Sequence, residues 1–137
     1  MPTLVTREFR REAVAVPAAR SFVRRTLDDW GITDRSDDML TCVSELATNV
    51  IRYDETPDHH FLVTLSSADA LLRIEVHDGS RRRPRMQSPG VDSTTGRGLL
   101  LVHALADGWG VEPRHPRGKI TWTEFKITTH HDLASPC

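Results

Sequence analysis

The chain is poor in the residues that build disulfide frameworks and membrane spans. Only two cysteines occur among its 137 residues, Cys42 and Cys137, and they are far apart, so we expect no disulfide framework. Two cysteines also cannot form a cysteine metal site unaided. No apolar run approaches the roughly 20 residues needed to cross a bilayer, and the N-terminus lacks the apolar segment of a signal peptide. We therefore expect a cytoplasmic protein with no membrane partner.

An excess of charge of one sign is also lacking. The 18 lysines and arginines nearly balance 19 aspartates and glutamates, for a formal net charge of -1. Such a balance gives no global field for nucleic acid, so we expect no direct nucleic-acid partner. A local basic cluster occurs at "SRRRPR", residues 80–85. The composition, 38% hydrophobic and 27% charged, is that of a soluble globular protein. The length predicts one domain, 8–130, with flexible termini at 1–7 and 131–137.

Two common nucleotide-binding motifs are missing. No G-x-x-x-x-G-K-[ST] occurs, and "GKI" at Gly118 has neither the upstream glycine nor the hydroxyl residue of that motif. No G-x-G-x-x-G follows a predicted strand either. A Walker-type site and a Rossmann fingerprint are thereby excluded.

Apolar periodicity predicts two long helices in the first half of the chain. One spans about 18–30, with Pro17 suited to a first turn and Gly31 just past the last. The other follows the capping residues of "TDRSDD" and ends near Tyr53.

Strands dominate the second half. "FLVTLSS" and "LLRIEVHD", joined by "ADA", predict an antiparallel hairpin, while "GWGVEP" and "GKITWTEFKI" predict two later strands. "GLLLVHALAD" predicts a short helix, and "TLVTREFR" an edge strand. The three tryptophans are expected in the core. The long stretch "GSRRRPRMQSPGVDSTTGRG" has no apolar period, which is typical of a functional loop.

Three elements of this pattern could carry chemistry. Glu45 and Asn49 share a helix face at spacing i, i+4, where they could bind one ligand or merely face water. Asp78 ends a predicted strand before Gly79, so it could accept a hydrogen bond from an amine or simply form a turn. Gly96 and Gly98 lie where the loop meets a helix, which suits an anion but also an ordinary turn.

Taken in order, E-L-x-x-N, D-G-S, a long loop and G-x-G-L resemble the GHKL (histidine-kinase-like) ATPase superfamily. Within it, "ARSFVRRTLDDWG", "VSELATNVIRY", "VHDGS", "GRGLLLVHALADGWGV" and "GKITWTEF" look like the anti-sigma-factor-type serine/threonine kinases, particularly the stand-alone ATP-binding regulators of actinobacteria. The resemblance covers about residues 8–127. It implies a Bergerat-type α/β fold, a two-layer sandwich whose mixed, mostly antiparallel sheet carries helices on one face.

The resemblance also implies a role for each matching residue. Asn49 would hold Mg²⁺ at the ATP phosphates, and Glu45 would be the general base. Asp78 would receive the adenine amino group, with Gly79 and Ser80 in the pocket wall. The phosphates would be closed over by Gly96, Arg97, Gly98 and Leu99, within a mobile lid at 81–98.

Two positions depart from the family's pattern. Tyr53 stands where the family often has histidine. Ile120 stands where a threonine commonly helps to bind adenine, two positions before the aromatic of the last strand. Thr121 is next to it, and its side chain is expected on the other face of that strand.

The resemblance implies an anti-sigma factor that phosphorylates a serine of an anti-sigma antagonist, with a sigma factor as the competing partner. Two other functions stay open: a non-catalytic ATP/ADP-dependent protein-binding switch, and a simple ATPase. A homodimer is also compatible with the sequence.

Overall fold

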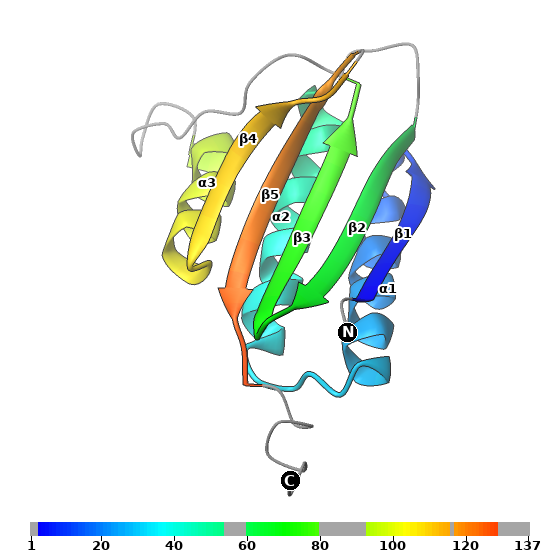
Figure 1. Cartoon of the computed structure of the whole chain (residues 1–137). Coiled ribbons are helices and arrows are strands. Elements are labelled where there is room, and N and C mark those ends of the chain that lie inside the picture. The colour runs from blue at the N-terminus through cyan, green and yellow to red at the C-terminus, as the bar shows by residue number, and fades with distance from the viewer. Residues whose placement is uncertain (1–2, 54–59, 80–92, 116, 129–137) are drawn as a thin grey trace, which may run out of the picture.

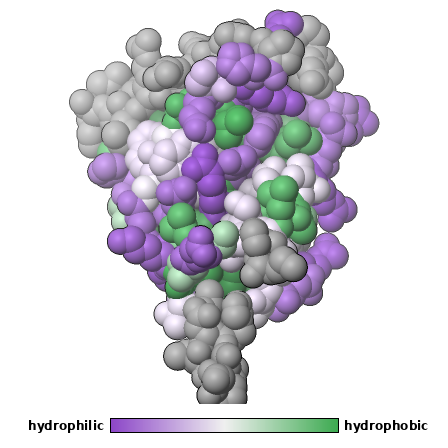
Figure 2. Space-filling model, viewed as in Figure 1, coloured by the Kyte–Doolittle hydropathy of each residue, from purple (hydrophilic) through white to green (hydrophobic). Residues whose placement is uncertain are grey.

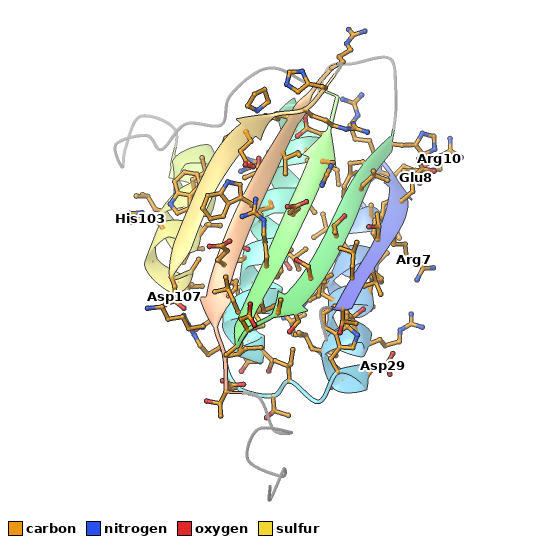
Figure 3. The ribbon with its side chains drawn as sticks, in the orientation of Figure 1. Arg7, Glu8, Arg10, Asp29, His103 and Asp107 are labelled. Atoms are coloured by element: carbon orange, nitrogen blue, oxygen red, sulfur yellow. The ribbon has the colours of Figure 1, made fainter. Side chains whose placement is uncertain are left out.

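The computed structural model describes residues 3–53, 60–79, 93–115 and 117–128 (Figure 1). Their elements, in chain order, are β1 (Thr3–Arg10), α1 (Ala15–Asp29), α2 (Ser36–Tyr53), β2 (His60–Ala68), β3 (Leu71–Asp78), α3 (Ser93–Leu105), β4 (Gly108–Pro113) and β5 (Lys119–Lys126).

The strands form one sheet in the order β1-β2-β3-β5-β4, and the helices lie together on one face of it (Figure 1). This confirms the two-layer α/β fold. All four strand pairings are antiparallel, so the sheet of the described residues is not mixed. Among the same residues, no helix is long and apolar enough to span a membrane.

The predicted hairpin of β2 and β3 is confirmed, and its turn explains its register. Asp69 and Ala70 have φ values of 55° and 62° and connect the paired residues Ala68 and Leu71. Two successive positive φ values in a two-residue turn match the right-handed twist of the flanking strands.

The N-terminal residues belong to the sheet from Thr3 onward, which corrects the expectation that 1–7 form a flexible terminus. β1 pairs with β2 along its whole length, as predicted for an edge strand. Phe9 is 8% exposed and stacks on Phe61, with 5.6 Å between ring centroids. This stacking packs β1 against the core. Residues 1–2 and 131–137 lie outside the described part of the chain.

The core lies between the sheet and the helices. Alternate residues of β3 (Leu72, Ile74 and Val76) are at most 1% exposed, as the two-residue period of a strand requires. α2 packs between α1 and α3 and buries Met39 and Val43 completely. Its residues thus reach the sheet and both neighbouring helices.

Three sequence predictions need correction. α1 starts at Ala15 rather than about residue 18, since Ala15 is only 4% exposed and its N–H binds the Glu12 carbonyl at 2.8 Å. α3 starts at Ser93, five residues before the expected start at Gly98. Trp122 faces away from the helices, packed over Gly110, whereas Trp30 and Trp109 pack against the core as predicted.

Candidate functional site

Most of the predicted site residues lie at one end of the two-layer sandwich. β3 ends at Asp78 and β5 begins at Lys119, which is its direct cross-strand partner. α2 and α3 run in opposite directions, so the last turns of α2 and the first turns of α3 lie at this same end (Figure 1). At the opposite end, Arg35 donates to the Leu105 carbonyl at 2.6 Å, joining the start of α2 to the end of α3.

Glu45 and Asn49 lie on one face of α2, as their spacing predicts. Both side chains are half-buried, next to the fully or nearly fully buried Leu46 and Val50. They therefore sit at the border of the core rather than on a fully solvated face. Two oxygen-bearing side chains at such a border are partly shielded from water, a setting that suits ligand binding.

Cys42 precedes Glu45 on the same side of α2 but is chemically inert. Its side chain is fully buried. Burial raises the pKa of the Cys42 thiol to about 12, and the nearby carboxylate of Asp38 opposes ionisation further. Since the reactive form of cysteine is the thiolate, Cys42 is a packing residue and not a nucleophile.

Asp78 is the most enclosed charged residue of the site. Its side chain is 2% exposed, and its Oδ1 accepts a hydrogen bond from Lys119 Nζ at 3.0 Å. Lys119 is itself only 11% exposed. Lys119 is not among the residues predicted from the sequence, where "GKI" was considered only as a phosphate-binding motif. Its position opposite Asp78 depends on the pairing of β3 with β5, which are not consecutive in the chain, so no local signal could have found it.

Gly118 lets β5 enter beside Asp78. Its φ is +99°, and a Cβ built at this position would lie 2.0 Å from the Asp78 carbonyl oxygen and 3.0 Å from Gly79 Cα. No side chain fits there, because the obstructing atoms are backbone. The close approach of the two strand ends fixes the positions of Asp78 and Lys119 relative to each other.

The face of β5 that carries Lys119 also carries Thr121, which is 5% exposed. Cross-strand pairing places Thr121 opposite Val76, on the helix side of the sheet with Asp78. Ile120 pairs with His77 on the other side. As expected, the side chains of Thr121 and Ile120 lie on opposite faces of the strand. Thr121 lies on the same face of the sheet as Asp78, and Ile120 does not. The threonine that could assist Asp78 is therefore Thr121.

The glycine-rich segment is only partly described. Gly96, Arg97 and Gly98 have helical backbone within α3, and Leu99 buries its side chain in the core at 1% exposure. Leu99 could therefore reach a phosphate only through its backbone. Ser80 and the first part of the expected lid, 81–92, lie outside the described residues.

The donor set fits a nucleotide bound with Mg²⁺. Asn49 supplies an amide oxygen, a type of ligand that Mg²⁺ takes, and Mg²⁺ usually completes its shell with substrate phosphates and water. Within the described ranges, no group of three or more His, Cys, Asp or Glu residues could hold a metal ion by itself. A single amide oxygen from the protein suits a metal site that is shared with the nucleotide, and it leaves the Glu45 carboxylate available to act as a base.

Comparison with protein families gives a match over most of the chain. The family model described as the histidine kinase-like ATPase domain matches residues 9–124. A search of the curated proteins returned no match.

Two solved structures share the fold. The RsbU and RsbW domains of Rv1364c from Mycobacterium tuberculosis match 93% of this chain with a TM-score of 0.69 and 18% identity. The histidine kinase domain of the blue-light activated histidine kinase of Erythrobacter litoralis EL346 matches 90% with a TM-score of 0.51 and 19% identity. The chain spans 32% and 64% of these two structures, respectively.

Proposed function

The chain belongs to the family of histidine kinase-like ATPase domains, and from that membership we propose that it is an ATP-binding anti-sigma factor with serine-protein kinase activity. The observation that carries the proposal is the enclosed carboxylate of Asp78 at the same end of the sandwich as the last turns of α2. An acceptor in that position suits the amino group of adenine, and Asn49, nearer the helix end than Glu45, suits the phosphates.

Each residue has a separate task in this proposal. Asp78 accepts a hydrogen bond from the adenine amino group, while Gly79 allows the base to approach the backbone. Asn49 offers its amide oxygen to Mg²⁺, which neutralises phosphate charge when bound. The glycines and Arg97 of α3, with Leu99 through its backbone, bind the phosphates, and Ser80 completes the wall of the base pocket.

Glu45 acts as the general base. Its carboxylate takes the proton of a serine hydroxyl on the partner protein, and the serine oxygen then forms a bond to the γ-phosphorus. The bond from that phosphorus to the bridging oxygen breaks, leaving ADP. Phosphoryl transfer needs positioning and charge stabilisation above all, which a half-buried carboxylate on a packed helix provides.

The partners follow from the sequence resemblance to anti-sigma-factor-type kinases. The acceptor is an anti-sigma antagonist, and a sigma factor competes for the protein. The fold shared with a structure that contains an RsbW domain supports this assignment. ATP binding without transfer would make the protein a nucleotide-dependent switch, and transfer to water alone would make it an ATPase.

Glu45→Gln separates catalysis from binding. The variant keeps the volume of the side chain but cannot take the proton, so transfer of labelled γ-phosphate to an antagonist serine should fall at least about 100-fold. ATP affinity by calorimetry should change less than about threefold, because a general base acts on the serine hydroxyl of the partner and not on the nucleotide. Glu124→Gln, on the helix-free face of the sheet, is the matched control and should leave both quantities unchanged.

Asn49→Ala tests the metal contact in the same assays. It should weaken ATP binding about tenfold or more when Mg²⁺ is present and have little effect when EDTA removes it. Thr48→Ala is its neighbour control, since the Thr48 hydroxyl binds the Ser44 carbonyl within α2 at 2.7 Å. Equal loss of affinity with and without Mg²⁺ would contradict the metal role of Asn49.

A further inference from the structure

Lys119 is an unusual residue for the helix-facing side of a sheet. Lysine is almost never buried unless it is paired, and here a lysine side chain that is 11% exposed meets an aspartate side chain that is 2% exposed. Buried ion pairs contribute little to stability, because desolvating both charges offsets their attraction. A role in recognition would account for a pair of this kind at a proposed base site.

The pair presents an acceptor and a donor side by side. The Asp78 carboxylate only accepts hydrogen bonds, whereas the Lys119 ammonium has three donors, of which the bond to Asp78 uses one. The Watson–Crick edge of adenine carries the opposite pattern, since its amino group donates and the neighbouring ring nitrogen N1 accepts. Asp78 and Lys119 are therefore complementary to that edge.

We propose that Lys119 is a base-contacting residue that donates a hydrogen bond to N1 of adenine while Asp78 accepts one from the amino group. This inference rests on the proposed binding of ATP. The hydrogen bond from Lys119 would be a second contact to the base. Nucleotide selectivity would then depend on N1 of adenine as well as on its amino group.

The backbone around the pair supports this contact. Asp78 and Lys119 are direct cross-strand neighbours, so their side chains leave the sheet on the same side. Gly118 lets the two strand ends approach closely, and the hydrogen bond to Oδ1 holds the ammonium beside the carboxylate. A donor fixed in this way loses little entropy when it binds a ligand.

The test compares ATP with 1-deaza-ATP, in which a C–H group replaces N1. Calorimetry on the full chain should show that wild type binds 1-deaza-ATP about 10- to 100-fold more weakly than ATP, the loss expected when a charged donor is left without its acceptor. Lys119→Met should bind ATP more weakly than wild type and should bind the two nucleotides equally. The exposed lysine of β5 provides the control: Lys126→Met should behave as wild type.

The outcomes separate this inference from the proposed function. If wild type binds neither nucleotide at millimolar concentration, the ATP proposal fails and this contact fails with it. If wild type binds both equally, ATP binding stands and the contact to N1 is wrong. The contact is also wrong if Lys119→Met weakens both nucleotides by the same factor, which would make Lys119 only a support for Asp78. The wild-type comparison decides the question even if Lys119→Met does not fold.

Discussion

Arg73 is the centre of the charged cluster on the sheet face that the helices leave open. It donates to Glu75 at 2.8 Å and to Glu124 at 2.9 Å, and its guanidinium lies 4.5 Å from the centroid of the Trp122 ring. Glu75 also bonds His77 at 2.8 Å. Burial opposes the charge of Glu75, but the hydrogen bonds from Arg73 and His77 outweigh it and hold the pKa of Glu75 below its usual range.

This lowered pKa predicts a loss of stability in acid. A carboxyl whose pKa is lower in the folded state stabilises the fold fully above its unfolded pKa, about 4.3, and loses that contribution as the pH falls through the folded value. Urea titrations at pH 7 and pH 3 give the fall in unfolding free energy between the two pH values. This fall should be smaller for Glu75→Gln than for wild type by about 1 kcal/mol. Glu12→Gln, an exposed control, should retain the wild-type difference.

At the scale of elements, the edge strand β4 is joined to β5 by an unusual contact. Gly110 pairs with Trp122, and the indole lies so close that a Cβ at Gly110 would be 2.8 Å from Cζ2. An aromatic ring covering a glycine on the neighbouring strand compensates for the missing side chain. On this helix-free face of the sheet, Trp122 packs between Gly110 and Arg73 and not in the core.

Gly110→Ala should therefore destabilise the protein by about 1–3 kcal/mol, since the new methyl group pushes the indole away from β4 and crowds it against Arg73. Urea denaturation followed by tryptophan fluorescence measures both the loss of stability and the change around the ring. Gly108→Ala is the matched control on the same strand, because its Cβ would meet only ordinary contacts, the nearest at 3.7 Å. Equal effects of the two substitutions would argue against the packing explanation.

At the scale of the whole molecule, the site draws on the sheet and two helices, so its ligand should stabilise the fold as a unit. Saturating ATP with Mg²⁺ should raise the midpoint of thermal unfolding by about 4 °C or more, since a ligand that binds only the folded state shifts the equilibrium toward it. Asp78→Asn should abolish this increase relative to its own nucleotide-free midpoint.

The same substitution in the turn before β3, at the opposite end of the sheet, provides the control. Asp69→Asn places asparagine at a positive φ that asparagine tolerates, and it should keep the full response to ATP. An undiminished response in Asp78→Asn would remove Asp78 from the base site.

Much of the fold follows from local patterns in the sequence. The apolar stripe of α2 follows the 3.6-residue period of a helix, and the alternation in β3 follows the two-residue period of a strand. The end of α2 at Tyr53 coincides with the end of its apolar stripe. The early starts of α1 and α3 could not be predicted in this way. Ala15 is helical because it packs into the core, and the residues from Ser93 to Gly98 give no apolar period.

The sequence by itself determined the elements, the family and the spacing of Glu45 and Asn49, because each depends on residues close together in the chain. Tertiary structure alone decided that Lys119 meets Asp78 across 41 positions, that Thr121 shares their side of the sheet, and that Trp122 lies outside the core. All three depend on strand register. A shift of one residue in the pairing would send each side chain to the other face, and no local pattern in β5 fixes that register without its neighbours.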